Sequence, residues 1–244
     1  MEIGIEDVVR LFRIRTVVCN FSGGKDSLVS THLAHESLKD ADAAIEVLHV
    51  DTTIALPGVQ DFVKSVCERY GWKLAVVKPK RDFFTLAKRW GMPTQKRRWC
   101  CVALKIKPII SYLRHKERPI LTVTGIRAFE SIRRRIMVER GELRQLMWHK
   151  KQKAYLYSPI FWWKDEEVER YALEKALPVS PIKSLLGYSG ECICGVYTSV
   201  EDVRLIKQHF PEFFEKLVEL EKSFRYGSLL YDYDKKQRIF VSKL

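Results

Sequence analysis

The 244-residue sequence has no long uninterrupted run of apolar residues. A helix that crosses a bilayer needs about 20 such residues, so we expect a chain without a membrane-spanning segment. The first residues also lack the basic and apolar regions of a secretory signal peptide, which favours the cytoplasm. Internal repeats and low-complexity stretches are missing too. These absences exclude solenoid and disordered classes and leave a globular fold.

Acidic residues are scarce in one part of the chain. The formal net charge is +13, and the segment 96–153 accounts for the whole excess, because the two signs balance elsewhere. Aromatic residues are interleaved with these charges, namely Trp99, Tyr112, Phe129 and Trp148. Such a basic band (residues 96–153) favours binding of a polyanion such as tRNA or DNA. A merely solubilising surface is the alternative.

Cysteine is absent after Cys194, although the chain holds 6 cysteines. Cys19 lies in a strand-like run and Cys67 on a helical face, so both are expected in the core. The other four form two close pairs, which are Cys100 with Cys101 and Cys192 with Cys194. Four thiolates in two pairs can hold a [4Fe–4S] cluster or tetrahedral zinc. The third alternative is that these four cysteines bind no metal.

A six-residue segment with a glycine pair, residues 22–27, directly follows the apolar run 16–21. Glycines let backbone N–H groups approach an anion, and a following helix points its positive N-terminus at it. The carboxylate of Asp26 is expected to hold Mg²⁺ together with phosphate oxygens. A turn without a ligand is the alternative. The predicted phosphate loop consists of Ser22, Gly23, Gly24, Lys25, Asp26 and Ser27.

Strand-like and helical patterns alternate along most of the chain. This order predicts an α/β fold, a Rossmann-like open parallel sheet with helices on both faces. Asp51 and Gly125 then fall at the carboxyl ends of strands, where such sheets bind nucleotides. The stretch 129–153 is expected to be an extended basic hairpin or loop. We predict a nucleotide-binding domain over 1–195 and a small helical extension over 196–244.

Further motifs occur in a fixed order, at 49–58 (HVDTTIALPG), 98–108 (RWCCVALKIKP), 125–134 (GIRAFESIRR) and 157–171. Together with the phosphate loop they resemble the phosphoadenylyl-sulfate (PAPS) reductases of the adenine-nucleotide α-hydrolase superfamily. The resemblance implies an enzyme that binds ATP, adenylyl sulfate (APS) or PAPS with Mg²⁺ and carries a [4Fe–4S] cluster on the four paired cysteines. It also implies a sulfur or electron donor protein as partner. The chain could act as a monomer or as a homodimer. The implied catalytic residues are Lys25, Asp26, Arg127 and Arg134.

Two departures from the family pattern bear on the reaction. The second cysteine pair is Cys-x-Cys, one residue tighter than the family's Cys-x-x-Cys, and the tail lacks the family's catalytic cysteine. Without that nucleophile the ordinary reductase mechanism is disfavoured. We therefore expect ATP-dependent adenylation with sulfur transfer to a nucleic acid. A sulfonucleotide reductase and a non-catalytic nucleotide-binding subunit are the alternatives.

Overall fold

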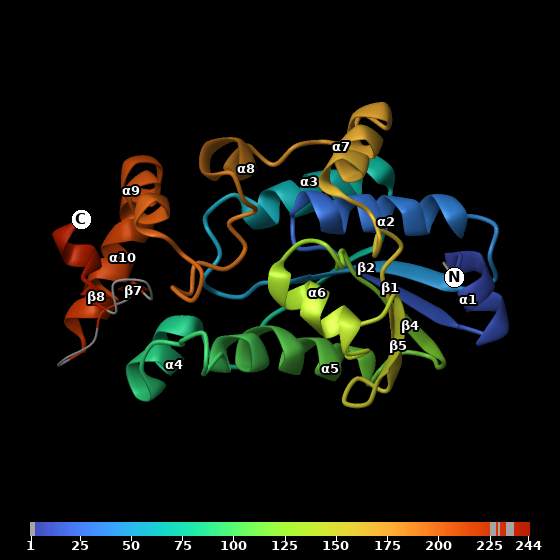
Figure 1. Ribbon diagram of the computed structural model, residues 1–244, viewed down its shortest axis with the longest axis horizontal. Coiled ribbons are helices and arrows are strands. Elements are labelled where there is room, and N and C mark those ends of the chain that lie inside the picture. The colour runs from blue at the N-terminus through green and yellow to red at the C-terminus, as the bar shows by residue number, and fades with distance from the viewer. Residues whose placement is uncertain (1–2, 225–227, 229, 233–236) are drawn as a thin grey trace. The chain divides into compact units, whose positions relative to one another are not determined.

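The computed structural model describes residues 3–224, 228, 230–232 and 237–244 (Figure 1). The chain divides into two compact units. The first comprises 1–49, 61–77 and 109–180, and the second comprises 50–60, 78–108 and 181–244. The two predicted domains, 1–195 and 196–244, are continuous in sequence, whereas each compact unit combines several segments. The domain boundary at residue 195 stays a prediction.

The first unit is built on a six-stranded sheet in the order β3-β2-β1-β4-β6-β5. Strand β1 pairs in parallel with β2 and β4, and β4 pairs in parallel with β6, whereas β5 pairs with β6 in the antiparallel sense. Nearly every residue of β1 and β4 is buried, as expected for strands covered on both faces. The predicted mostly parallel α/β sheet is therefore confirmed. The strands are β1 (Thr16–Asn20), β2 (Ala44–Val50), β3 (Leu74–Val77), β4 (Ile120–Val123), β5 (Leu146–His149) and β6 (Ala154–Tyr157).

Helices cover both faces of this sheet (Figure 1). Alternate residues of β1 explain the layering, because Val17 and Cys19 pack with α1 and α2, whereas Val18 packs with α5. A third apolar cluster joins α2, α3 and α7 through Val29, Val63 and Val168. The helices concerned are α1 (Ile5–Leu11), α2 (Lys25–Ser37), α3 (Val59–Tyr70), α5 (Lys107–Leu113), α6 (Ile132–Glu139) and α7 (Asp165–Glu174).

The second unit is mainly helical and has its own apolar core. That core includes Phe83, Leu104, Ile206 and Leu217. Helix α9 spans Val200–His209 and begins with a capping box between Ser199 and Asp202. The unit contains α4 (Phe83–Trp90), a π-helix η1 (Cys101–Ile106), α8 (Pro181–Leu186), α9, α10 (Pro211–Lys222), the antiparallel pair β7 (Leu230–Asp232) and β8 (Gln237–Ile239), and η2 (Val241–Lys243).

The structure corrects the expectation for 129–153. This stretch is not simply a hairpin or loop, because it contains the helix α6 before the strand β5. Ser131 caps the helix by accepting a hydrogen bond from the backbone N–H of Arg134 at 3.3 Å. Strand β5 does form a hairpin with β6. None of the helices among the described residues has the length and apolar character needed to span a bilayer.

Candidate functional site

The phosphate loop connects β1 to α2 in the first unit. Gly23 has a φ of 90°, a conformation that favours glycine. The Ser27 hydroxyl donates to the Gly24 carbonyl at 2.8 Å and lies 3.0 Å from the Ser22 hydroxyl. Gly24 is the N-cap of α2 and has no side chain to offer to the first-turn N–H groups. Hydrogen bonds of its own serines thus hold the loop in shape. The loop leads directly into the N-terminus of α2, which is the positive end of the helix dipole.

Gly125 approaches this loop from the end of β4. A Cβ atom built on Gly125 would lie 2.6 Å from the carbonyl carbon of Asp26 and 2.7 Å from the backbone nitrogen of Ser27. Both are backbone atoms, so neither can rotate away. The predicted role of Gly125 in nucleotide binding stays a prediction. Its close contact with the phosphate loop gives an independent physical reason for a glycine here.

Replacing Gly125 with alanine should therefore force β4 and the start of α2 apart. We expect the free energy of unfolding in urea to fall by about 1–3 kcal/mol, the usual cost of overpacking. Gly4→Ala is the control, because a Cβ there meets only the flexible carboxylate ends of Glu6 and Asp7. Equal losses in the two variants would contradict the close approach.

Arg127 follows β4 and is buried, with 5% of its side chain exposed. Its Nε donates to Asp26 Oδ2 at 2.9 Å, and one terminal nitrogen donates to Asp165 Oδ1 at 2.7 Å. Burial alone would lower the Arg127 pKa, but the two carboxylates outweigh it and raise the pKa overall. The guanidinium is thus held charged against Asp26, the residue expected to hold Mg²⁺.

Lys25 is paired across the same site. Its Nζ lies 2.7 Å from Glu169 Oε1, and 18% of the lysine side chain is exposed against 65% for the glutamate. Arg134, the fourth residue with an implied catalytic role, lies in α6 and pairs with Glu130. Asp26 contacts Arg127 directly, and α7 supplies the carboxylate partners of Arg127 and Lys25.

Asp51 belongs to the second unit, at the end of β2. Its Oδ1 accepts a hydrogen bond from the backbone N–H of Thr53 at 2.8 Å, and its Oδ2 lies 3.4 Å from Lys78 Nζ. Thr53 has a φ of 60°, so the carboxylate stabilises a tight turn. The predicted nucleotide contact of Asp51 stays a prediction.

The four paired cysteines all lie in the second unit. Cys100 Sγ is 3.6 Å from Cys194 Sγ, which joins the two pairs. The backbone around Cys192 is fixed to the segment 52–56, because Leu56 donates to the Gly190 carbonyl and Ile193 donates to the Ile54 carbonyl, each at 2.9 Å. Residues 94 positions apart in sequence are therefore assembled into one thiol cluster (Cys100, Cys101, Cys192 and Cys194).

Lys105 lies beside this thiol cluster. Its Nζ is 2.7 Å from Glu191 Oε1. The pKa of Cys101 is lowered to about 7, first by a hydrogen bond with Cys100 and then, against the opposing effect of burial, by Lys105. By contrast, burial raises the pKa of Cys67 to about 11 and also raises that of Cys19. Cys19 and Cys67 are buried, as predicted for core residues.

The four cysteine thiols are a donor set that suits a soft metal. Among the residues described, no group of three or more His, Cys, Asp and Glu side chains is arranged as a ready metal site. Thiolates around tetrahedral zinc, each about 2.3 Å from the ion, lie about 3.8 Å apart, close to the 3.6 Å between Cys100 and Cys194. Soft thiol donors next to a lysine suit zinc or an iron–sulfur cluster. The chemistry of the four side chains fits a metal, and their ligand role stays a prediction.

Sequence reasoning missed the carboxylates that pair with these groups. Asp165 and Glu169 lie on α7, and Glu191 lies next to Cys192. Their partners are distant in sequence, as 144 positions separate Glu169 from Lys25. The spacing of Asp165 and Glu169, one helical turn apart, was the available signal, but it is equally typical of a solvated helix face.

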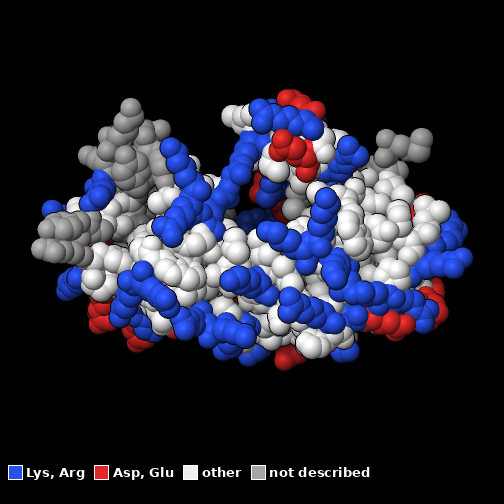
Figure 2. Space-filling view, turned by 90° about the horizontal axis from the view of Figure 1, so that it is seen from below, with Lys and Arg blue, Asp and Glu red and all other residues white. Residues whose placement is uncertain are grey.

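The basic band runs through both units, and its part from 109 to 153 belongs to the first. Helix α6 has no buried residue, and its Arg133 and Arg135 are exposed. Phe129 and Trp148 are about half exposed. Figure 2 shows one face of the molecule, on which Lys and Arg side chains are spread far more widely than Asp and Glu. Arg127, Arg134 and Lys105 of the band are paired with carboxylates, whereas Arg133 and Arg135 present their charge to solvent.

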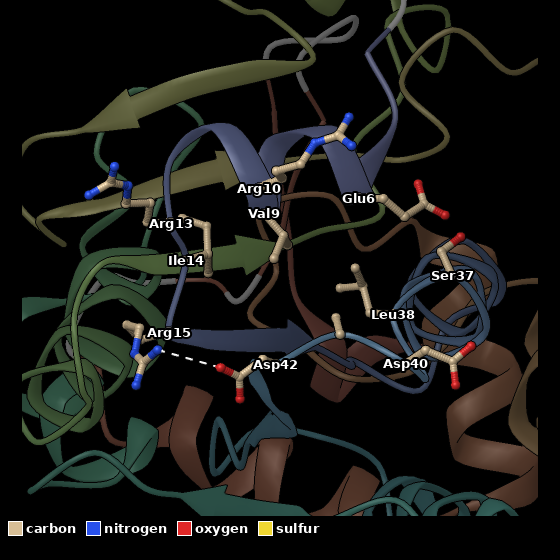
Figure 3. A pocket seen from close by; sticks show the side chains of 11 residues that line it. Glu6, Val9, Arg10, Arg13, Ile14, Arg15, Ser37, Leu38, Asp40 and Asp42 are labelled. Atoms are coloured by element: carbon tan, nitrogen blue, oxygen red, sulfur yellow. Dashed lines mark ion pairs between the residues drawn. The ribbon is translucent and has the colours of Figure 1, made fainter.

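A pocket of about 570 Å³ lies between α1 and the end of α2 (Figure 3). Its floor is apolar, with Val9, Ile14 and Leu38. Two of its rim arginines are ion-paired, since Arg10 lies 2.5 Å from Asp7, and Arg15 pairs with Glu117 at 3.1 Å and Asp42 at 3.8 Å. The pocket includes none of the predicted site residues, so we assign it no part in the site.

The chain is similar in sequence to curated proteins and in structure to solved proteins. The uncharacterised protein MJ0973 of Methanocaldococcus jannaschii is 29% identical over 214 residues, which cover 85% of this chain but 48% of that protein. The chain thus spans about half the length of this relative. A PAPS reductase of Candida auris, solved as a phosphate complex, matches with a TM-score of 0.56 and 19% identity, over 81% of this chain and 90% of that one. The U34-tRNA thiolase NcsA of Methanococcus maripaludis, solved with its [4Fe–4S] cluster, matches with a TM-score of 0.50 and 19% identity, over 85% and 71%.

These structural similarities confirm the fold. The phosphoadenosine phosphosulfate reductase domain matches residues 16–200, a range that includes the phosphate loop, Gly125, Arg127 and the four paired cysteines. The chain therefore belongs to the phosphoadenosine phosphosulfate reductase family, within the adenine-nucleotide α-hydrolase superfamily.

Proposed function

We propose that the protein binds Mg·ATP at the phosphate loop, adenylates an acceptor oxygen on a nucleic acid and directs sulfur transfer to the activated position. The observation that carries this proposal is the buried Arg127 held against Asp26 beside the loop. A buried cation, a lysine and the N-terminus of α2 together suit a chain of several phosphates. A carboxylate at the same place suits their magnesium ion.

In the proposed reaction, a carbonyl oxygen of a nucleobase attacks the α-phosphorus of ATP. The bond to the β-phosphate oxygen breaks and pyrophosphate leaves, so the acceptor carbon then carries AMP as a leaving group. Hydrosulfide attacks that carbon, the carbon–oxygen bond breaks so that AMP leaves, and loss of the sulfur-bound proton leaves a thiocarbonyl. The cations Lys25, Arg127 and Arg134 would stabilise the charge that develops on the phosphate oxygens.

Cys100, Cys101, Cys192 and Cys194 would hold the metal group. When bound, an iron–sulfur cluster would supply iron as a soft site for sulfur. A hydrogen bond with Cys100 and then Lys105 favour the thiolate of Cys101, whose pKa is lowered. At Cys192 a hydrogen bond with Cys194 and burial outweigh Lys105 and raise the pKa. Burial by Ile193 and its neighbours would keep water from them.

Nucleic acid is the favoured acceptor because one segment carries the whole charge excess. Exposed arginines on α6 could contact phosphates, while Phe129 and Trp148 offer exposed rings on which bases stack. The similarity to a tRNA thiolase supports the same class of acceptor. A tRNA or a DNA would fit this surface equally.

Neutralising Arg133, Arg135 and Arg140 by glutamine should weaken binding of unfractionated tRNA about tenfold or more at 0.1 M salt. Each lost phosphate contact should also make the salt dependence of the binding constant shallower by about one unit of slope. Filter binding across a salt series measures both. The matched control is a triple glutamine variant of Lys39, Lys64 and Lys175, which lie outside the band. An unchanged slope in the band variant would contradict the nucleic-acid surface.

An APS or PAPS reductase is the second candidate, and the family domain favours it. The reductase mechanism needs a thiolate nucleophile, a role that Cys192 or Cys194 would have to take among the cysteines of this sequence. A nucleotide-binding subunit without activity is the third, and the greater length of MJ0973 is compatible with a larger assembly.

Product analysis distinguishes the three candidates. We expect the anaerobic protein to release pyrophosphate from Mg·ATP when tRNA or DNA and sulfide are present, and to release no sulfite from APS or PAPS. Sulfite release with a thiol reductant would identify a reductase. Nucleotide binding without either product would identify the non-catalytic subunit.

A further inference from the structure

Helix α7 packs firmly beside the phosphate loop. Val168 is buried in the apolar cluster that contains Leu28 and Val29 of α2. On the same side, the Tyr171 hydroxyl lies 2.9 Å from His32 Nδ1. These contacts fix the register of α7 on α2, whose first turn carries the phosphate loop. Polar groups on this face of α7 are therefore held at fixed positions relative to the loop.

Two carboxylates one turn apart on α7 meet the two cations of the site. Asp165 lies 2.7 Å from Arg127, and Glu169 lies 2.7 Å from Lys25. Asp165 joins an arginine that also contacts Asp26, so it belongs to a continuous charged chain. Glu169 differs, because its pair with Lys25 places an acidic group directly on the cation expected to meet phosphate.

The burial of the two partners indicates which one can move. Lys25 has 18% of its side chain exposed, whereas Glu169 has 65% exposed. Ion pairs with one well-exposed partner are weak and readily exchanged. A phosphate oxygen can therefore take the place of the Glu169 carboxylate, while Lys25 stays where the loop holds it.

We propose that Glu169 is a positioning residue that occupies Lys25 in the ligand-free protein and competes with phosphate for it. The glutamate holds the Lys25 ammonium beside the phosphate loop. An incoming anion must therefore bind Lys25 more strongly than the Glu169 carboxylate does. This inference rests on the proposed phosphate site, but not on the proposed reaction. It predicts that removing the carboxylate charge strengthens anion binding, which a merely structural role would not do.

The test measures the affinity of the full chain for magnesium pyrophosphate by calorimetry. Glu169→Gln should bind pyrophosphate about threefold to fivefold more tightly than the wild type, the factor that a half-exposed ion pair supplies. Glu166→Gln is the matched control, since it removes the same charge from an exposed position on the same helix. Its affinity should equal that of the wild type.

Three outcomes would overturn the proposal: unchanged or weaker binding by Glu169→Gln, an equal gain in both variants, or no binding by any of the proteins. The first two leave the phosphate site and the proposed function intact, because pyrophosphate still binds. The third removes the phosphate site as well. Pyrophosphate binding does not depend on adenylation. The proposed reaction can therefore be wrong while the competition between Glu169 and phosphate is right.

Discussion

Replacing Lys25 with alanine should lower the affinity for Mg·ATP about 100-fold or more. The lysine stands at the first position of α2, and its ammonium is held at the phosphate loop by Glu169. Charge-assisted hydrogen bonds to an anion contribute about 1.5–3 kcal/mol, and a factor of ten corresponds to about 1.4 kcal/mol. Loss of the ammonium also leaves the Glu169 carboxylate to repel the phosphates. Calorimetry on the full chain measures the change.

The control for Lys25→Ala is Lys64→Ala, an exposed lysine of α3 that removes the same charge. Its ATP affinity should stay within about twofold of the wild type. Both variants should also fold, because Lys25 belongs to a surface ion pair, which contributes little to stability. Equal ATP affinity in Lys25→Ala and the wild type would reject the phosphate-loop assignment.

The second large effect is expected at the thiol cluster. Protein purified without oxygen should contain about four iron and four sulfide per chain if the site holds a [4Fe–4S] cluster. Serine at Cys101 or at Cys192 should remove most of this iron, because a neutral hydroxyl replaces a soft thiolate ligand. Elemental and sulfide analysis of each variant, together with the visible absorption of the cluster, measures the loss.

Cys67→Ala is the matched control, since Cys67 is buried in the first unit and lies outside the thiol cluster. It should keep the metal and lose only some stability through a small cavity. About one zinc per chain and no iron would replace the iron–sulfur assignment by a zinc site. Full iron content in the serine variants, or no metal in the wild type, would contradict the predicted ligands.

Much of the fold follows from local patterns that the sequence displays. The run before Ser22 is apolar at nearly every position, which is typical of a strand covered on both faces, and β1 occupies it. The helical pattern after Gly195 is occupied by α9, and the structure adds a capping box between Ser199 and Asp202 at its start. Where the signal is local, the element and its position could both be read.

Helix α6 was missed because it lacks the signal on which such predictions depend. None of its residues is buried, and its consecutive arginines interrupt any apolar face. Ile132 is 70% exposed. Met137 and Val138 pack against a small apolar cluster around Phe161, but two partly buried residues give a weak helical period. The helix start at Ser131 carries a capping serine, but the residues after it read as an unstructured basic segment.

The phosphate loop could be predicted for a similar reason, since six consecutive residues carry it. The pairings around it could not, because they join distant segments. Arg127 meets Asp26 across 101 positions, and Lys105 meets Glu191 across 86. Motif order brings these residues into one family pattern, but only the packing of β4, α2 and α7 reveals that Asp165 and Glu169 complete the charge arrangement.

The central claim is that the site binds ATP in preference to a sulfonucleotide. Anaerobic calorimetry on freshly purified protein, with Mg·ATP competing against APS and then PAPS, tests it most directly. We expect tight binding of Mg·ATP and at least tenfold weaker binding of both sulfonucleotides. Tighter binding of APS or PAPS than of ATP would contradict adenylation and favour the reductase.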